Sequence, residues 1–192
     1  MRSSAAVIIC GAAMAMTGCG GSGADSTATS AATSRATTTV AAPTGALVRI
    51  CDRALADEVE PALRSQGFRG APELRPHATG AGGLSACDLG PVELSLDAAN
   101  DAVQRYQNRI VETAQFSDSI PSHVPKPIKG VGDRRLGAAG ANWIPFLHQL
   151  LSARGKRVLI VTVNGGGLSN AERLSAAKAI SLAVYDRLGT AS

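Results

Sequence analysis

The run Val158–Val163 constrains the fold of this chain more than any other segment. It reads Val-Leu-Ile-Val-Thr-Val, so a strand formed here carries mostly apolar side chains on both faces. A strand of that kind must be covered by a layer on each side. The run therefore predicts the central strand of a sheet with packing layers on both faces.

Three helices are expected around this sheet. The first has leucine and valine recurring at helical spacing, and Pro61 is expected to bend it or to start a second short turn. Asp97 is a candidate N-cap for the second helix. The third follows the capping box Ser169–Glu172, in which serine and glutamate each satisfy a backbone amide. The helices are expected at Asp52–Gln66, after Asp97 with Val103, Tyr106, Ile110 and Ala114 on its apolar face, and from the capping box to Leu188 with Gly189 as C-cap.

Five or six strands are predicted from alternation and from short apolar runs. Val92, Leu94 and Leu96 alternate with polar residues, which is typical of a half-buried strand. Pro76 restricts the first strand to a sheet edge. The order of elements predicts an α+β fold with a mostly antiparallel sheet and three packing helices. The strands are expected at Glu73–Thr79, Ser85–Leu89, Val92–Leu96, Arg134–Ala139, Phe146–Ala153 and Arg157–Val163, with a glycine-rich loop at Gly80–Gly83, a loop at Phe116–Lys129 and a hairpin turn at Arg154–Lys156.

The N-terminus resembles a bacterial lipoprotein signal. A basic segment, Met1–Ser4, precedes the apolar stretch Ala5–Met16, and Gly18 stands directly before Cys19. The apolar stretch has 12 residues, whereas a transmembrane helix needs about 20. The resemblance implies export, removal of residues 1–18 and acylation of Cys19 with a diacylglyceryl anchor. The chain is then expected on the extracytoplasmic face of the cell membrane.

Composition divides the rest of the chain into a tether and one domain. The 27 residues of Gly20–Ala46 include 11 Ser or Thr and only two charges, so residues 19–46 are expected to be a disordered tether. Residues 47–192 are enough for one domain with a real core. Without residues 1–18 the chain has 18 Lys and Arg against 15 Asp and Glu, a formal +3. This mild charge and the scarcity of aromatics argue against a nucleic-acid partner.

Two cysteines remain after processing. Cys10 belongs to the predicted signal and Cys19 to the anchor, which leaves Cys51 and Cys87. An even pair in an oxidising compartment predicts a disulfide. A redox pair would favour the spacing Cys-x-x-Cys, and no histidine or aspartate lies at the spacing of a zinc site. No metal and no cofactor is expected.

Catalytic residues are not evident in the sequence. His77, His123, His148, Ser85 and Asp88 include the residue types of a hydrolase triad, but no Gly-x-Ser-x-Gly elbow supports one. The glycines near residue 130 lack the third glycine of a phosphate loop. The glycines before the third helix precede an N-terminus that could attract an anion, but a flexible strand-to-helix turn is the expected explanation.

Basic residues cluster in two loop segments, one near the Gly-Val-Gly-Asp turn and one at the predicted hairpin tip, and to a lesser degree in Arg173–Lys178. If these loops meet at one end of the sheet, they form a cationic surface for anionic lipid headgroups or for an acidic envelope protein. The alternative is a scattered, solvated set of charges. The candidate contact residues are Lys126, Lys129, Arg134, Arg135, Arg154, Lys156 and Arg157.

Further motifs resemble those of a group of uncharacterised actinobacterial, mycobacterial-type lipoproteins with one cysteine pair. The motifs are Cys51 before a helix, Cys87-Asp88-Leu89 entering a strand, Gly130-Val131-Gly132-Asp133, and the late apolar strand followed by a final helix. The role of this group is not established, so the resemblance implies an anchored domain without a mechanism. A similar fold in photosystem-associated lumenal proteins and nuclear-import accessory proteins serves non-enzymatic binding.

These observations predict a membrane-anchored binding or interaction module of the cell envelope rather than an enzyme. Two alternatives remain open. One is a hydrolase-like envelope enzyme, and the other is a structural or surface lipoprotein without a ligand.

Overall fold

The computed structural model describes residues 45–68, 73–117, 120–165 and 167–190. The predicted signal, Cys19 and the tether up to Thr44 lie outside these ranges. Ala46, which was assigned to the tether, packs against the hydrophobic core. No helix in the described part of the chain is long and apolar enough to cross a membrane.

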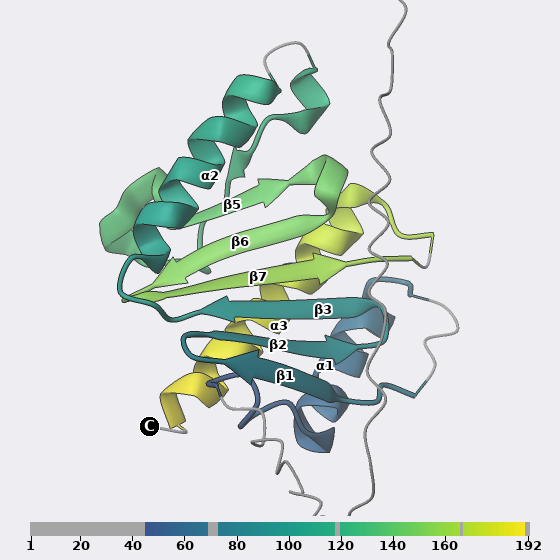
Figure 1. The fold of residues 1–192 in the computed structure, drawn as a ribbon. Helices are drawn as coiled ribbons and strands as arrows, with labels where there is room; N and C mark the ends of the chain where they lie inside the picture. The colour runs from purple at the N-terminus through teal and green to yellow at the C-terminus, as the bar shows by residue number, and fades with distance from the viewer. Residues whose placement is uncertain (1–44, 69–72, 118–119, 166, 191–192) are drawn as a thin grey trace, which may run out of the picture. The chain divides into compact units, whose positions relative to one another are not determined.

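The fold is α+β, with seven strands in one fully antiparallel sheet (Figure 1). The strand order is β1-β2-β3-β7-β6-β5-β4. The predicted central strand occupies the middle of the sheet as β7, between β3 and β6. The strands are β1 (His77–Ala81), β2 (Leu84–Leu89), β3 (Val92–Asp97), β4 (Lys126–Pro127), β5 (Ala141–Ile144), β6 (Gln149–Arg154) and β7 (Arg157–Val163).

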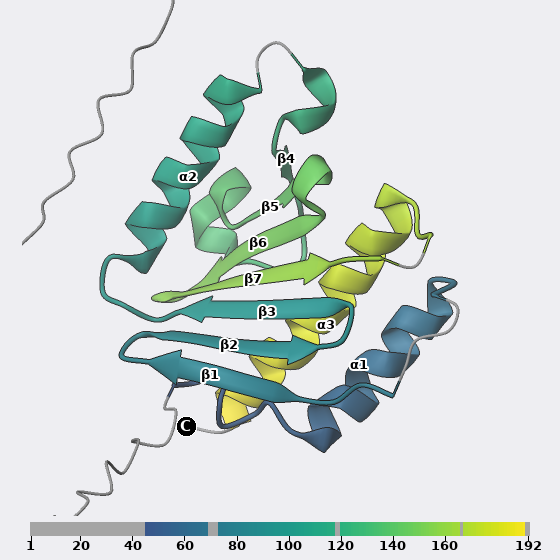
Figure 2. The same cartoon turned by 45° about the vertical axis from the view of Figure 1, so that its right-hand side comes forward.

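Helices cover both faces of this sheet (Figures 1 and 2). The first and last helices contact each other on one face, and the last also contacts β6 and β7. The second helix lies over β7 on the other face. The helices are α1 (Arg53–Ser65), α2 (Ala102–Phe116) and α3 (Asn170–Thr190), and short 3-10 turns are η1 (Pro121–His123), η2 (Arg134–Ala139) and η3 (Pro145–Leu147).

Two hydrophobic cores result, one on each side of the sheet. The larger core, under α1 and α3, includes Leu94, Val161 and Ile180, which are all almost fully buried. The smaller core, under α2, includes Tyr106 and Leu151. Leu159, Val161 and Val163 face the first core while Val158 and Ile160 face the second. This arrangement confirms the prediction that β7 is covered on both faces.

Three sequence predictions about the sheet were wrong. Arg134–Ala139 is not a strand but a 3-10 turn, because Gly137 has φ 56° and the Asp133 carboxylate caps the backbone amide of Arg135. Strand β5 was missed because all four of its residues are buried and show no alternation. The proline-rich loop also contains β4, which adds the seventh strand.

Boundary predictions differ from the structure at three further points. Gly80 belongs to β1, so the glycine turn is only Gly82–Gly83, and Pro76 precedes that edge strand. Part of the predicted strand Phe146–Ala153 is the turn η3, after which His148 adopts φ 52°.

The helix ends were predicted with mixed success. Asp52 caps α1 by accepting the Leu55 amide at 2.8 Å, and the helix continues through Pro61 without a second start. Asp97 was wrongly predicted to cap α2: it ends β3, and Asp101 takes the N-cap position. Helix α3 continues through Gly189 to Thr190, so the predicted C-cap there is wrong.

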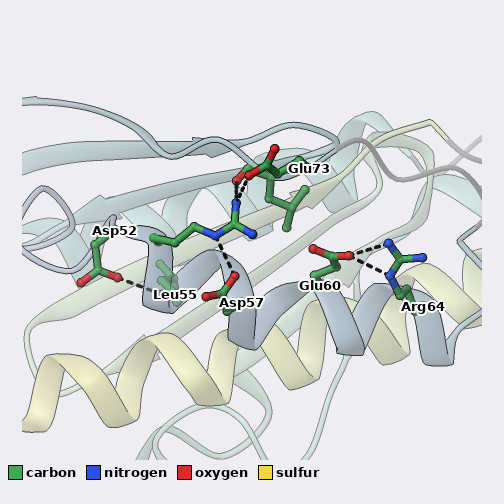
Figure 3. Close-up of polar contacts among 8 residues, drawn as sticks. Asp52, Leu55, Asp57, Glu60, Arg64 and Glu73 are labelled. Atoms are coloured by element: carbon green, nitrogen blue, oxygen red, sulfur yellow. Dashed lines mark hydrogen bonds and ion pairs between the residues drawn. The ribbon is translucent and has the colours of Figure 1, made fainter.

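The exposed side of α1 carries ion pairs that do little for stability (Figure 3). Arg64 pairs with Glu60 one turn earlier, and Arg53 reaches both Asp57 and Glu73 at 2.8 Å. Exposed pairs contribute about 0–1 kcal/mol each. The burial of Leu55, Ala56, Val59 and Leu63 therefore holds the helix in place.

The predicted disulfide is present. Cys51 precedes α1, and Cys87 lies fully buried in β2, with 5.7 Å between their Cα atoms. The bond joins the start of α1 to the half of the sheet that α1 covers.

The predicted capping box is also present. Ser169 Oγ accepts the Glu172 amide at 3.3 Å, and a Glu172 carboxylate oxygen accepts the Ser169 amide at 2.7 Å. The hydrogen bonds from Ser169 lower the pKa of Glu172, so this carboxylate is ionised at neutral pH.

Replacing Ser169 with alanine should lower the free energy of unfolding by about 1 kcal/mol, because the cap hydrogen bond is lost. Urea unfolding followed by circular dichroism measures this. Ser175→Ala, at an exposed mid-helix position, is the matched control and should change stability little. Equal effects of the two substitutions would contradict the capping role.

Candidate site at the cationic end of the sheet

The two basic segments meet at one end of the sheet. The Asp133 amide donates to the Ala153 carbonyl at 2.8 Å, and the Ala153 amide donates to the Gly140 carbonyl at 2.9 Å. Arg154 Nε donates to the Val131 carbonyl at 2.7 Å. The loop from β4 to η2 is thus fastened to the end of the β6–β7 hairpin. We call Lys126–Arg135 and Arg154–Arg157 together the cationic end.

Arg154 and Arg157 serve the fold at this end. Besides its hydrogen bond to Val131, Arg154 lies over the ring of Tyr185, with 4.5 Å between the guanidinium carbon and the ring centroid. Arg157 donates to the Leu188 carbonyl in the last turn of α3 at 3.3 Å. Both are only partly exposed. A contact role for these two residues would compete with the bonds that they already make.

The other five candidates are exposed at the surface: Lys126, Lys129, Arg134, Arg135 and Lys156. None of them makes an ion pair within the described ranges. Residues 119–171 contain seven Lys and Arg but a single acid, Asp133, a formal net charge of +6. The charge is therefore concentrated on the half of the sheet formed by β4–β7, although the whole chain has only +4.

A cavity of about 630 Å³ opens beside this loop. Its floor includes Gly140 and Ala141, which are buried, and its rim includes Lys129 and Arg134, which are exposed. We call it the β4–η2 cavity. Its lining residues are Pro127, Ile128, Lys129, Gly130, Gly132, Asp133, Arg134, Gly137, Gly140 and Ala141.

Glycines shape the β4–η2 cavity in two ways. A Cβ atom on Gly132 would lie 1.8 Å from the Gly140 carbonyl oxygen, so these two backbones touch and close the base of the loop. A Cβ atom on Gly130 or Gly137 would meet nothing within 4 Å, so open space adjoins both. The Gly-Val-Gly-Asp turn is therefore a structural closure, with Val131 fully buried in the core.

A buried polar cluster supports the same end from below. Tyr185 of α3 donates to the Ser152 carbonyl of β6 at 2.9 Å. Burial raises the pKa of Tyr185 to about 12, against the opposing effect of its hydrogen bond with Ser152. The hydroxyl therefore stays protonated, and Arg154 rests on a neutral ring. This cluster connects α3 to the hairpin that carries the cationic end.

A smaller cavity of about 250 Å³ lies between α2 and the sheet. Its charged groups already have partners: Arg105 bonds both Asp97 and Asp101, and Arg109 donates to the side-chain oxygen of Gln149 at 3.0 Å. Burial opposes ionisation of Asp97, but the hydrogen bonds from Arg105 and the Ala99 amide outweigh it and lower the pKa of this carboxyl. The charged side chains that line the smaller cavity are therefore already engaged in contacts within the protein.

The residue types of a hydrolase triad are not brought together. His77 and Asp88 are directly opposite each other on β1 and β2, and both are exposed. Ser85 lies three residues from Asp88 on the same strand, so it points to the other face of the sheet. Its hydroxyl accepts the Leu47 amide there at 3.1 Å. A sheet separates the serine from the histidine.

The other two histidines also have local partners. His123 stacks on Phe146, with 4.3 Å between ring centroids. His148 lies 3.4 Å from Arg173, and burial together with that cation lowers its pKa, so it is neutral at pH 7. Among the described residues, no group of three or more His, Cys, Asp or Glu could hold a metal ion.

The N-terminus of α3 does not offer a free anion site. The carboxylate of Glu172 already accepts the Ser169 amide and hydroxyl, each at 2.7 Å. Gly165 and Gly167 therefore belong to the connection from β7 to α3.

Comparisons with known proteins were made by family, by sequence and by structure: no family model, no curated protein and no solved structure matches this chain.

Sequence reasoning found the cations of this site but missed its cavity. Glycines and one short proline-flanked strand, β4, line much of the cavity wall, and neither has a distinctive side-chain pattern. The four glycines within eleven residues, at 130, 132, 137 and 140, were the available signal for a cavity here.

Proposed function

We propose that this protein is a non-enzymatic binding module of the cell envelope, anchored to the membrane through acylated Cys19. The supporting observation is the cationic end, where two segments separated in the sequence are hydrogen-bonded together and carry five exposed cations. Its expected partner is an anionic surface, such as anionic lipid headgroups. An acidic envelope protein is the other partner that this charge would attract.

The predicted tether supports this function. A flexible chain of 25 residues, from 20 to 44, has a root-mean-square span of about 28 Å. A domain on such a tether reaches the leaflet to which it is anchored, and each cation near an anionic leaflet contributes about 1 kcal/mol of attraction. Anchoring also raises the effective concentration of the domain at that leaflet, so a weak attraction is enough for binding.

Neutralising Arg135 and Lys156 together should lower binding to anionic vesicles by about 30-fold at low salt, because two cations are lost. The measurement is co-sedimentation of residues 19–192, exported with Cys19→Ala so that the disulfide forms. The binding of the unsubstituted protein should weaken at physiological ionic strength.

Arg49→Gln/Arg75→Gln is the matched control. It removes the same charge from exposed residues outside the cationic end, and neither residue makes an ion pair in the described structure. Equal binding by the two double variants would reject the cationic end as the contact. An unchanged affinity in neutral vesicles would reject electrostatic binding altogether.

The hydrolase alternative has less support, since the serine and the histidine of the candidate triad face opposite sides of the sheet. The alternative of a surface lipoprotein without a ligand predicts no vesicle binding, so the same experiment distinguishes it.

A further inference from the structure

We propose that the β4–η2 cavity binds a small molecule with an apolar body and one anionic group, a phosphate or a carboxylate. Lys129 and Arg134 would hold the anionic group at the rim, and the body would lie against the apolar lining residues Pro127, Ile128 and Ala141. This rests on the proposed function in that both use the cationic end, but it concerns a cavity rather than a surface.

The size of the cavity fits such a ligand. Small-molecule sites typically measure about 300–1,000 Å³ and have mostly apolar walls with a few polar groups that orient the ligand. The volume of about 630 Å³ lies within that range. Pro127, Ile128 and Ala141 supply apolar side chains, and four glycines supply walls without side chains.

The charge of the rim specifies the sign of the ligand. Lys129 and Arg134 are the two cations that line the cavity, and both are exposed. The single lining acid is Asp133, whose Oδ1 accepts the Arg135 amide at 2.9 Å and is thereby committed to capping η2. The surrounding formal charge of +6 over residues 119–171 adds a long-range attraction for anions.

The shape of the cavity is held by contacts that a ligand need not supply. The Ile128 amide donates to the Ala141 carbonyl at 2.9 Å across the floor, and the bonds of Asp133 and Arg154 fasten the loop to β6. The touching backbones of Gly132 and Gly140 close the base. A preformed site of this kind loses little ordering entropy on binding.

The test uses octyl phosphate as the probe, with octanol and inorganic phosphate as partial ligands and octanoate to compare the two anionic groups. Titration calorimetry of residues 19–192 carrying Cys19→Ala should give saturable binding of octyl phosphate, at least about tenfold tighter than octanol or phosphate alone. The fluorescence of Trp143, the single tryptophan, gives a second measurement, because it lies two residues from Ala141 on the same face of β5.

Two double variants with equal charge separate the cavity from the general surface. Lys129→Gln/Arg134→Gln should weaken octyl phosphate binding about tenfold or more, since charge-assisted hydrogen bonds are lost. Arg135→Gln/Lys156→Gln removes two cations that do not line the cavity and should change that affinity much less. Absence of saturable binding, or equal losses in the two variants, would overturn the proposal.

A third variant tests the apolar wall. Ile128→Trp should fill the cavity and abolish binding of both octyl phosphate and octanol, while vesicle binding persists. If that variant does not fold, amide chemical shifts of the unsubstituted protein decide: octyl phosphate should perturb Gly130, Gly137 and Ala141, and perturbation elsewhere only would overturn the proposal.

The two proposals fail separately. Loss of vesicle binding in Arg135→Gln/Lys156→Gln with no octyl phosphate site would leave the surface function without the cavity. Saturable binding of octyl phosphate by a protein that does not bind vesicles would leave the cavity site without the surface function.

Discussion

Replacing Cys51 and Cys87 together with alanine should lower the free energy of unfolding by about 3–4 kcal/mol. The disulfide closes a loop with a sequence separation of 36, and in the chain-entropy model its removal frees the unfolded chain to occupy many more conformations. Typical domains have only about 5–15 kcal/mol of stability, so the loss would be a large fraction of the total. Urea unfolding, monitored by circular dichroism, measures the change.

The unsubstituted protein under a reducing agent is the control for the loss of the two sulfur atoms. It should lose nearly as much stability as the double variant, whereas the same agent should leave the double variant unchanged. Because Cys87 is fully buried, the double variant is expected to be slightly the less stable of the two. An unchanged unfolding midpoint in either case would contradict a stabilising disulfide.

Gly132→Ala is expected to cost about 3 kcal/mol of stability or more, because it overpacks a closed contact. The new Cβ would lie 1.8 Å from the Gly140 carbonyl oxygen. The atoms that it meets belong to the backbone of Gly140, so they cannot rotate away as a side chain could. The loop would have to separate from β6, which breaks the hydrogen bonds of Asp133 and Ala153 at the cationic end. The β4–η2 cavity should be lost with it.

Gly137→Ala separates this steric effect from backbone strain. Gly137 has φ 56° and ψ −130°, a backbone conformation that alanine adopts at a cost of about 1–3 kcal/mol, but its Cβ would meet nothing within 4 Å. We therefore expect a smaller loss than for Gly132→Ala, measured by thermal unfolding of both variants in parallel. If Gly137→Ala were the more damaging, the close approach at Gly132 would not be what holds the loop.

Errors in the predicted elements occurred where local pattern and tertiary contact disagree. Strand β5 has four residues buried on both faces, and a short apolar run without alternation does not distinguish strand from helix. Asp97 has the side chain of an N-cap, yet its carboxylate pairs with Arg105 three positions inside α2, and the helix begins later. In both cases contacts between residues that are separated along the chain decided the local structure.

The candidate site was predictable only in its charges. The basic residues could be named from the sequence, but Arg154 and Arg157 have the same charge as Lys156 and only the fold commits them to Val131, Tyr185 and Leu188. The cavity depends on how the loop to η2 returns against β6. No local sequence pattern predicts this path of the loop. The hydrogen bonds that hold it join backbone amides and carbonyls, which nearly every residue has.

The sequence by itself determined the fold class, the central position of β7, the disulfide and the capping box. Each depends on a local property: two apolar faces need cover, an even cysteine pair in an oxidising compartment bonds, and serine with glutamate three residues later caps a helix. The tertiary structure alone decided which cations are free, that the two basic segments meet, and that a cavity opens between β4 and η2. These depend on the packing of segments far apart in the chain. The touching backbones of Gly132 and Gly140, and the hydrogen bond from Arg154 to the Val131 carbonyl, place the exposed cations and the cavity walls.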